Sequence, residues 1–258
     1  MSVTDFEILR FEEIDSTNSA LVERARQGAP DGLVLLAGHQ TAGRGRLGRT
    51  WEAPPGASLL TSILFRVPIG PEQLYLVTAA VSLSALKAIR SLTGIDAALK
   101  WPNDVLLGER KVAGVLSELV ETRQSTDGPE SAIVVGIGIN LLWPGPPGVE
   151  GTSLLESTGK SIDAESMLSA LLAELTVRRE ALLEPAGRDQ IATEFAQYLG
   201  TIGSKVKIEL PGEVVVARAI GVSPEGHLIV DDGAGPREIV TGDVIHLRPH
   251  SEPPTEAD

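Results

Sequence analysis

A change of sequence pattern at Gly200 constrains the fold of this chain more than any other feature. Up to that residue, apolar runs of strand length alternate with segments of helical periodicity. Beyond it, five short β-forming runs follow one another, separated by Pro-Gly, Pro-Glu-Gly and Gly-Ala-Gly turns. The 258 residues are enough for one large core and a smaller second domain. We therefore expect a mixed α and β domain over residues 1–200, a small antiparallel β-barrel over 201–250 and a disordered tail over 251–258.

The first of these domains is predicted to contain both helices and strands. Residues 15–18 form a run of N-cap side chains, Asp-Ser-Thr-Asn, and precede a short helix that stops at Gly28. Apolar periodicity predicts a long helix over 72–92, and it returns over 164–199 with an interruption at 184–187. Strands are expected over 33–40, 58–67, 97–101, 105–107, 111–121 and 131–142, with polar loops over 122–130 and 143–151.

The composition excludes several classes of protein and site. Lys and Arg number 22 against 35 Asp and Glu, and the net charge of −13 repels nucleic acids and anionic membranes. No cysteine is present, which excludes disulfides, thiolate metal sites and a cysteine nucleophile. No metal held by the protein is expected, because no metal-binding spacing occurs among the histidines, which are His39, His227, His246 and His250.

Neither a signal peptide nor a membrane span is predicted. The chain starts with the polar stretch MSVTDFEILR, which is not the basic and then apolar pattern of a signal peptide. Its longest strictly apolar run, with glycine allowed, covers residues 132–139, whereas a membrane-spanning helix needs roughly 20 residues. We therefore expect a cytoplasmic protein with neither DNA nor a membrane as its partner.

A loop rich in glycine and arginine follows the first buried strand and reads Gly43-Arg44-Gly45-Arg46-Leu47-Gly48-Arg49-Thr50. It matches the dinucleotide-binding pattern G-x-G-x-x-G and is one substitution away from a P-loop, and both patterns require a helix directly after the loop. The next residues, 51–56, contain two adjacent prolines and cannot form that helix. Backbone amides and guanidinium groups in such a loop suit anionic oxygens, although a solvated basic loop accounts for the pattern equally well.

A second cluster combines Lys100-Trp101-Pro102-Asn103-Asp104 with Lys111-Val112-Ala113-Gly114. The residues between them, 108–110, are a hairpin signal that returns Lys111 to the side of the first strand. Asn103, Asp104 and Lys111 would then converge on one site. The alternative is an ordinary hairpin with an exposed lysine and an Asn-Asp turn, and residue types alone favour this alternative.

Three shorter features each have a structural and a functional interpretation. Glycines in the apolar run Gly136-Ile137-Gly138-Ile139-Asn140 mark either a bulge or a close approach to a bound molecule. Ser16-Thr17-Asn18 either caps a helix or binds a ligand, and capping is the more common role. Gln40 either pairs with neighbouring backbone or points into a pocket. Since no Ser-His-Asp order, metal triad or carboxylate dyad stands out, the implied chemistry is electrostatic, with cations and amides around anionic oxygens.

Taken together, these segments resemble the biotin protein ligase family. The matching elements are, in order, Ser16-Thr17-Asn18, Gln40 with the GRGRLGRTW loop, KWPNDVLLGERKVAGVL and GIGIN. The resemblance runs from about Ile14 to Arg248, and the four elements in this order are highly specific. It implies an α+β fold whose mixed or antiparallel sheet and flanking helices resemble class II aminoacyl-tRNA synthetase catalytic domains. A small SH3-like β-barrel would follow at the C-terminus.

The resemblance implies a ligation in two steps. Biotin and Mg-ATP give biotinyl-5′-adenylate and pyrophosphate, and the biotinyl group then moves to one lysine of the biotin carboxyl carrier domain of a carboxylase. ATP and Mg²⁺ are the implied cofactors, and the family includes monomers and homodimers. Only 15 residues precede Ser16, which is too few for the DNA-binding domain of some members, so a form without repressor function is expected.

The family's residue roles carry over to the matching positions of this sequence. The residues implied to bind biotin are Ser16, Thr17, Asn18, Gln40, Arg44, Gly45, Arg46, Lys111, Gly114 and Gly136. Those implied to surround the adenylate are Arg46, Arg49, Trp51, Asn103, Lys111, Asn140 and Arg248, with Trp51 near adenine. In the chemistry, Lys111 would bridge the biotin carboxylate and the α-phosphate, and Arg46 and Arg49 would hold phosphate oxygens. Asp104 would accept a proton from the carrier lysine or orient it.

Two alternative functions stay open on the sequence. A lipoate ligase or octanoyltransferase shares the catalytic fold and also modifies a carrier lysine, although the arginine loop and the KWPND segment favour biotin. A non-catalytic regulator would use the same loop only to sense biotin. Pyrophosphate exchange that depends on biotin and not on lipoate distinguishes a biotin ligase from a lipoate ligase. Transfer of label from biotin to a carrier lysine excludes the non-catalytic regulator.

Overall fold

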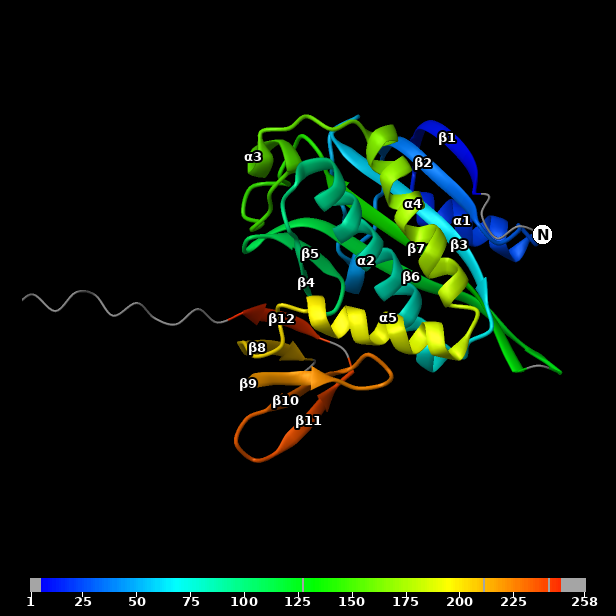
Figure 1. Cartoon of the computed structure of the whole chain (residues 1–258). Helices are drawn as coiled ribbons and strands as arrows, with labels where there is room; N and C mark the ends of the chain where they lie inside the picture. Colours follow the sequence, from blue (N-terminus) through cyan, green and yellow to red (C-terminus); the bar gives the residue numbers. More distant parts are fainter. Residues whose placement is uncertain (1–5, 127, 211, 241, 247–258) are drawn as a thin grey trace, which may run out of the picture. The chain divides into compact units, whose positions relative to one another are not determined.

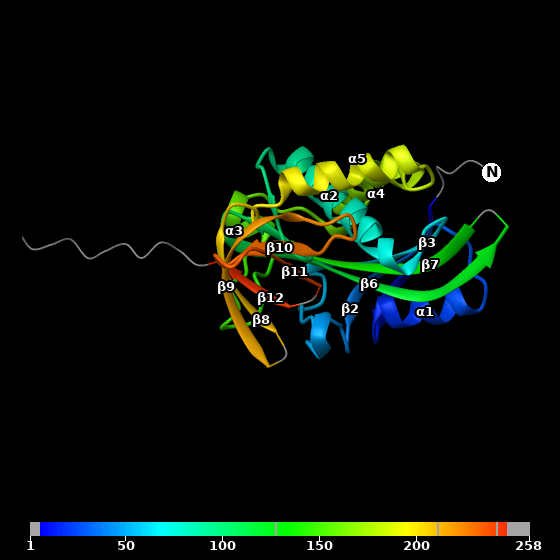
Figure 2. The ribbon, with the colours of Figure 1, turned by 90° about the horizontal axis from the view of Figure 1, so that it is seen from below.

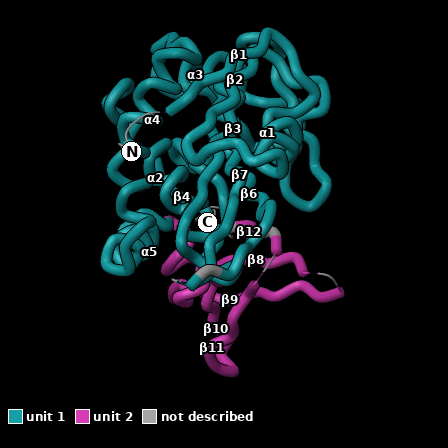
Figure 3. The backbone as a smooth tube through the Cα atoms, turned by 90° about the vertical axis from the view of Figure 1, so that its right-hand side faces the viewer, with its two compact units in different colours: residues 1–199 teal, residues 200–258 magenta. Residues whose placement is uncertain are grey.

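The computed structural model describes residues 6–126, 128–210, 212–240 and 242–246. The chain divides into two compact units, Met1–Leu199 and Gly200–Asp258, which Figure 3 shows in different colours. Arg248 and the tail over 251–258 lie outside the described residues.

The first unit is built around a seven-stranded sheet with the strand order β1-β2-β3-β7-β6-β5-β4 (Figure 1). β1 pairs with β2 in parallel, and every other neighbouring pair of the sheet is antiparallel. The expected α+β class with a mixed sheet is therefore confirmed. The strands are β1 (Glu7–Ile14), β2 (Leu33–Gln40), β3 (Ser58–Val67), β4 (Ala98–Lys100), β5 (Asp104–Leu107), β6 (Arg110–Ser125) and β7 (Gly128–Asn140).

Helices cover both faces of this sheet. α1 (Thr17–Arg26) lies on one face and contacts β3 and β7, whereas α2 (Leu74–Thr93) and α4 (Ala164–Ala181) lie on the other (Figure 2). α5 (Pro185–Tyr198) packs against α2 and α4, and α3 (Leu154–Thr158) is a short helix in the connection that leads to α4. The core of the unit fills the two spaces between the sheet and its helices.

α2 is the central helix of this core. Leu83 and Ile89 are fully buried, and Gly94 ends the helix with a φ of 80°, a left-handed conformation that favours glycine. By length and composition alone, the segment Pro71–Thr93 is long and apolar enough to cross a membrane, but 72% of its most apolar window is buried inside the protein. Burial on all sides is also typical of the core helix of a globular protein.

Two features of the first unit differ from the sequence-based expectation. The polar stretch over 122–130 is not a loop, because β6 and β7 continue through it as a hairpin, paired from Thr122 with Ser131 to Ser125 with Gly128. The hairpin tip extends beyond the other strands (Figure 1), so its residues are polar although they lie in strands. β1 was not predicted, because its run EILRFEEI is mostly exposed or half-buried and lacks a strict alternation of apolar residues.

The second unit is a five-stranded antiparallel sheet with the order β11-β10-β9-β8-β12. Alternate residues on neighbouring strands, among them Val206, Ile208, Ala217 and Ala219, are buried, so one face of the sheet forms a small core. The strands coincide with the five β-forming runs of the sequence and are β8 (Lys205–Leu210), β9 (Glu213–Val222), β10 (Leu228–Asp231), β11 (Pro236–Ile239) and β12 (Asp243–His246).

Candidate active site

A cavity opens on the first unit beside the amino-terminal end of α1. Its walls come from α1, the end of β2, the arginine loop and the strands β3, β6 and β7. The lining residues are Ser16, Thr17, Asn18, Gln40, Arg44, Trp51, Leu60, Thr61, Gly114, Leu116, Gly136, Ile137 and Gly138.

Glycines form part of the cavity wall because side chains from other elements pack directly onto the strands there. A Cβ on Gly136 would overlap the amide of Asn18, and a Cβ on Gly138 would overlap the indole of Trp51. A Cβ on Gly114 of β6 would lie 3.1 Å from the Trp51 ring. The pairing of β7 with β3 and β6 is regular at these glycines. They therefore mark a close approach of side chains, and the alternative of a bulge is wrong.

The Ser-Thr-Asn run both caps α1 and lines the cavity. Ser16 is the N-cap residue, and its side chain accepts a backbone N–H of the first turn. The backbone N–H of Thr17 donates to Gln40 Oε1 over 2.7 Å, and the Thr17 hydroxyl lies 3.0 Å from the same oxygen. Asn18 Nδ2 donates to Glu118 Oε2 over 2.9 Å. Gln40 thus ends β2 with its side chain held against the start of α1.

Three polar residues at or beside the cavity were not predicted from the sequence. Thr61 lines it, whereas Ser62 and Glu118 contact residues that do. Ser62 of β3 is fully buried, and its Oγ lies 2.7 Å from Thr17 Oγ1 and 2.6 Å from Asn18 Oδ1. Glu118 of β6 accepts hydrogen bonds from Asn18 and Arg44. A hydroxyl residue in the middle of a buried apolar strand is the signal that could have identified Ser62. No comparable signal marks Glu118, since a second glutamate, Glu121, follows three residues later on the same strand and does not line the cavity.

The arginine loop, residues 43–50, contains a 3-10 turn at Arg46–Gly48 and no α-helix, as the prolines after it predict. The Gly45 N–H donates to the carbonyl of Arg49 over 2.7 Å and closes the turn. Arg44 forms a two-pronged ion pair with Glu118, with N···O distances of 2.8 and 3.1 Å. This contact holds the loop against β6 at the cavity.

A cationic cluster, which we define as Arg46, Lys100 and Lys111 around Asp104, lies beside the cavity. Lys111 Nζ is 2.6 Å from Asp104 Oδ1. Burial lowers the pKa of Arg46 and of Lys100, and in both cases attraction to Asp104 opposes the effect, with Glu150 as a weaker partner of Lys100. Because positive charge is concentrated here at partly buried positions, an anionic ligand would be stabilised.

Trp51 connects the cationic cluster with the cavity. Its ring lines the cavity and lies 5.5 Å from Lys111 Nζ, measured to the ring centroid. Its indole N–H is buried and has no hydrogen-bond partner among the described residues, which makes it a donor for a ligand. Asn103 borders the cluster, because its Nδ2 donates to Val115 O over 2.7 Å and its Oδ1 lies 3.5 Å from Arg46 Nη1.

Some residues proposed from the sequence do not line the cavity. Asn140 is buried, and its Nδ2 donates to the carbonyls of Pro144 and Thr152 over 3.2 and 3.0 Å. Thr152 N in turn donates to Lys111 O over 2.8 Å, so Asn140 anchors the segment that pairs with the Lys111 backbone. Arg248 lies outside the described residues. Six more residues proposed from the sequence lie in the arginine loop or in and beside the cationic cluster, outside the cavity lining. They are Gly45, Arg46, Arg49, Asn103, Asp104 and Lys111.

The described part of the chain offers no ready metal site. Across residues 6–126, 128–210, 212–240 and 242–246, no group of three or more His, Cys, Asp or Glu side chains is arranged to hold a metal ion. The site therefore consists of hydroxyls, amides and cations, which favour electrostatic chemistry on anionic oxygens.

Both units match known domains. Residues 10–140 match the biotin/lipoate A/B protein ligase family, and residues 201–247 match the biotin protein ligase C-terminal domain. The first match includes every lining residue of the cavity and the whole cationic cluster.

Individual proteins agree with these matches. The chain is 37% identical to a biotin–[acetyl-CoA-carboxylase] ligase of Mycobacterium tuberculosis, over 90% of this chain and 86% of that protein. It is 32% identical to one of Paracoccus denitrificans, over 90% of this chain and 97% of that protein. A structure of biotin protein ligase from Aquifex aeolicus in complex with biotin and ATP is 30% identical, with a TM-score of 0.76 and coverage of 94% of this chain and 99% of that chain. The chain therefore belongs to the biotin/lipoate A/B protein ligase family, as one of its biotin protein ligases.

Proposed function

We propose that this protein activates biotin with ATP to biotinyl-5′-AMP and transfers the biotinyl group to a lysine of a biotin carboxyl carrier domain. The similar proteins of M. tuberculosis and P. denitrificans are named biotin–[acetyl-CoA-carboxylase] ligases, and the similar A. aeolicus structure contains biotin and ATP. The observation that carries the proposal is the meeting of the cavity with the cationic cluster at Trp51 and Lys111.

The cavity is suited to the ring system of biotin. Its lining combines hydroxyl and amide groups with the Trp51 ring and apolar side chains of β3, β6 and β7, and the glycines of β6 and β7 leave room for Asn18 and Trp51 to reach this position. The C-terminal domain match supports biotin over lipoate as the ligand. We assign biotin binding to Ser16, Thr17, Asn18, Gln40, Arg44, Gly45, Arg46, Lys111, Gly114 and Gly136.

In the first step, an oxygen of the biotin carboxylate attacks the α-phosphorus of ATP, and the bond to pyrophosphate breaks. Two anions have to approach each other, so fixed positive charge at the point of reaction lowers the barrier. Lys111 bridges the carboxylate and the α-phosphate in this proposal, while Arg46 and Arg49 hold phosphate oxygens. We assign the rest of the nucleotide site to Trp51, Asn103, Asn140 and Arg248.

In the second step, the amine of the carrier lysine attacks the carbonyl carbon of the adenylate, and AMP leaves. The amine loses a proton in this step, and Asp104 is the candidate acceptor. Asp104 is paired with Lys111 at 2.6 Å, so Lys111 has to turn toward the ligand before Asp104 can accept a proton. Asp104→Ala is expected to slow transfer from preformed biotinyl-AMP, and an unchanged rate would remove this role.

Mg²⁺ enters the reaction as part of the MgATP substrate. The described residues offer no cluster of carboxylates or histidines that fits the ion. Phosphate oxygens of ATP supply the hard oxygen ligands that Mg²⁺ prefers, together with water.

The proposal extends to the finer features of the fold and to the setting of the enzyme. We infer that the first unit has the class II synthetase-like fold, that the second is an SH3-like barrel, and that the protein works in the cytoplasm as a monomer or homodimer. The net charge of −13 supports an enzyme that does not bind DNA. A gel shift with biotin operator DNA that shows tight binding would contradict this last point.

The proposed function is tested by incubating the protein with MgATP, biotin and a carrier domain, followed by a streptavidin blot. We expect a labelled carrier only when both biotin and ATP are present. Labelling of the carrier with lipoate in place of biotin would identify a lipoate ligase. Biotin binding without any transfer would identify a regulator and contradict the proposal.

A further inference from the structure

One carboxylate, that of Glu118, connects the arginine loop to the wall of the cavity. Its Oε1 accepts from Arg44 Nη2 over 2.8 Å, and its Oε2 accepts both from Arg44 Nη1 over 3.1 Å and from Asn18 Nδ2 over 2.9 Å. The Glu118 side chain is 24% exposed and that of Arg44 is 46% exposed. Among the described residues, the donors to this carboxylate are Arg44 of the loop and Asn18 of α1.

These contacts continue as a network of polar side chains that includes residues of the cavity lining. Asn18 Oδ1 lies 2.6 Å from Ser62 Oγ, which lies 2.7 Å from Thr17 Oγ1. The backbone N–H of Thr17 donates to Gln40 Oε1 over 2.7 Å. Gln40 ends β2 only a few residues before Arg44, so the network ends next to the loop in sequence.

The donors of this network require a group at position 118 that accepts hydrogen bonds on two atoms. Asn18 directs its Nδ2 to two groups that only accept, Leu116 O and Glu118 Oε2. Its Oδ1 then faces Ser62, whose single hydroxyl proton has to be donated to it. Arg44 and Asn18 both present donors to position 118, and only a carboxylate can accept on both of its atoms.

We propose that Glu118 is a positioning residue that holds the arginine loop closed over the cavity and thereby slows the escape of the bound ligand. Arg44 lines the cavity, so a loop released from Glu118 would uncover it. An activated adenylate loses its biotinyl group to water when it is exposed, and a retained loop protects it. This inference rests on the proposed function for the identity of the ligand, but the anchoring of the loop does not depend on it.

The substitution Glu118→Gln distinguishes anchoring of the arginine loop from a general contribution to the stability of the fold. A glutamine can still place its oxygen where Oε2 accepts from Asn18 and Arg44, but its amide then opposes the second donor of Arg44. The matched control is Glu121→Gln on the same strand, where the carboxylate pairs with Arg66 at 3.5 Å and Arg123 at 3.0 Å. Neither of these arginines lines the cavity.

The first experiment is limited proteolysis of the ligand-free protein with trypsin, since the loop offers Arg44, Arg46 and Arg49 as cleavage sites. Mass spectrometry of the fragments gives the rate of cleavage at these three positions. Glu118→Gln is expected to raise this rate roughly threefold to tenfold, the effect of a two-pronged charge-assisted contact at a partly exposed position. Glu121→Gln is expected to leave it at the wild-type value.

The second experiment measures biotin dissociation and steady-state adenylation. Glu118→Gln is expected to raise the dissociation rate and the KM for biotin by a similar factor, with kcat within about twofold of wild type. Wild-type rates of both cleavage and dissociation in Glu118→Gln, or equal increases in Glu121→Gln, would overturn the inference. If the wild-type protein binds no biotin, the proposed function fails, and the trypsin result alone decides whether Glu118 anchors the loop.

Discussion

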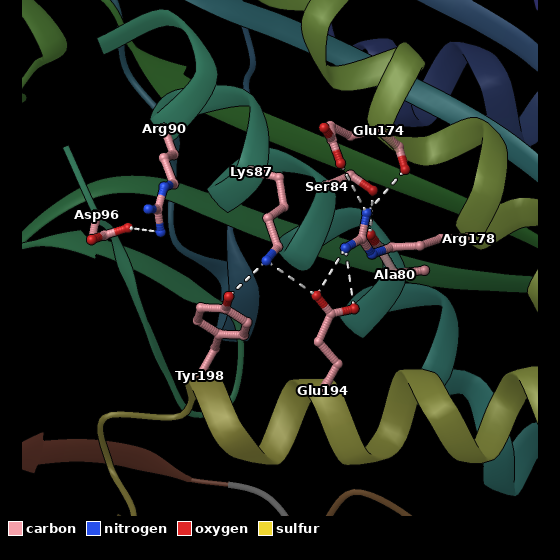
Figure 4. Close-up of polar contacts among 9 residues, drawn as sticks. All are labelled: Ala80, Ser84, Lys87, Arg90, Asp96, Glu174, Arg178, Glu194 and Tyr198. Carbon is pink, nitrogen blue, oxygen red and sulfur yellow. Dashed lines mark hydrogen bonds and ion pairs between the residues drawn. The ribbon is translucent and has the colours of Figure 1, made fainter. Parts of the chain in front are cut away.

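Two polar clusters in the first unit contain similar side chains but differ in their surroundings. The cationic cluster lies beside the cavity, whereas a second cluster joins three helices, α2, α4 and α5 (Figure 4). We call it the helix cluster and define it as Lys87, Glu174, Arg178, Glu194 and Tyr198. In it, Lys87 Nζ donates to Tyr198 OH over 2.6 Å, and Arg178 contacts both oxygens of Glu194 at 3.0 and 3.1 Å.

Charge balance separates the two clusters. In the helix cluster, Lys87 and Arg178 face two carboxylates, and the hydrogen bond to Tyr198 raises the pKa of Lys87. In the cationic cluster, three cations share Asp104, with Glu150 as a weaker partner of Lys100 alone, and burial lowers the pKa of Lys100. The helix cluster therefore has the charges that it needs to hold helices together. The cationic cluster gains most when an anion binds.

The hollows next to the clusters also differ. The hollow beside the helix cluster is lined by α5 alone, through Asp189, Gln190, Thr193, Glu194 and Gln197. The cavity is lined from α1, the arginine loop and four strands. A ligand that is contacted from several elements is fixed in orientation, as catalysis requires, whereas a single helix face offers only a surface. A polar cluster thus indicates a ligand-binding site when it has an excess of one charge and lies beside a cavity that several elements line.

The largest expected difference between the clusters is in the rate of biotin adenylation after one lysine is replaced by alanine. Lys111→Ala is expected to slow biotin adenylation by about 100-fold or more, because it removes a preorganised cation from the reacting oxygens. Lys87→Ala, the matched change in the helix cluster, is expected to stay within about twofold of the wild-type rate. Biotin-dependent release of pyrophosphate measures both, and similar losses in the two variants would remove the distinction.

Crowding the cavity wall is expected to have the next largest effect. In Gly138→Ala, the new methyl group overlaps the Trp51 indole, so the ring has to move. Overpacking of this kind costs about 1–3 kcal/mol, which, taken from the binding free energy, corresponds to biotin binding weakened by about fivefold to 150-fold. Gly221→Ala in β9 is the control, because a Cβ there meets no atom within 4 Å. Calorimetric titration with biotin compares the two, and unchanged affinity in Gly138→Ala would contradict the close approach.

A change in the helix cluster is expected to affect stability and not activity. Glu194→Gln removes the carboxylate shared by Arg178 and Lys87, at a cost of about 1–2 kcal/mol for a partly exposed charged network. Urea denaturation measures this loss, with Glu180→Gln at an exposed position of α4 as the control. A loss of adenylation activity at 25 °C with unchanged stability would assign the helix cluster to the site.

The smallest expected effect is a difference in pH dependence between two lysines. The pKa of Lys87 is raised above its ordinary value of 10.5, so its contribution to stability is complete below that pH and is lost as the pH rises through the folded-state pKa. The pKa of Lys100 is lowered, so its charge destabilises the folded state at neutral pH, and this cost fades between the lowered pKa and 10.5. Urea denaturation at pH 7 and pH 10 is expected to show that Lys100→Gln gains stability over wild type at pH 7 and gains less at pH 10. Lys87→Gln is expected to lose stability by the same amount at both, and the reverse pattern would contradict the assigned environments.

Much of the fold follows from local sequence patterns. The run over 58–67 was predicted as a strand with the bounds that β3 has, because a strand covered by helices on both faces is apolar along its whole length. The five runs after Gly200 are five strands in the structure, and they could be predicted because turn residues separate them. The site segments were recognised from the resemblance of four segments, in order, to the biotin protein ligase family, because each segment alone also has a structural explanation.

The remaining features depend on contacts that no local pattern shows. β1 is set at the edge of the sheet by its pairing with β2, and the tip of the β6–β7 hairpin is polar because it leaves the core. Glu118 has the spacing of any exposed residue on a strand, and only the fold brings Arg44 to it across 74 positions of sequence. Long-range partners of this kind become visible only in three dimensions.

The most direct test of the account is a crystal structure of the protein with biotin and a non-hydrolysable ATP analogue. The account predicts that biotin occupies the cavity, with its ring in contact with Asn18 and Trp51, and that its carboxylate lies within hydrogen-bond distance of Lys111 Nζ beside the α-phosphate. Biotin bound elsewhere, or a carboxylate far from Lys111 and from the arginine loop, would contradict it.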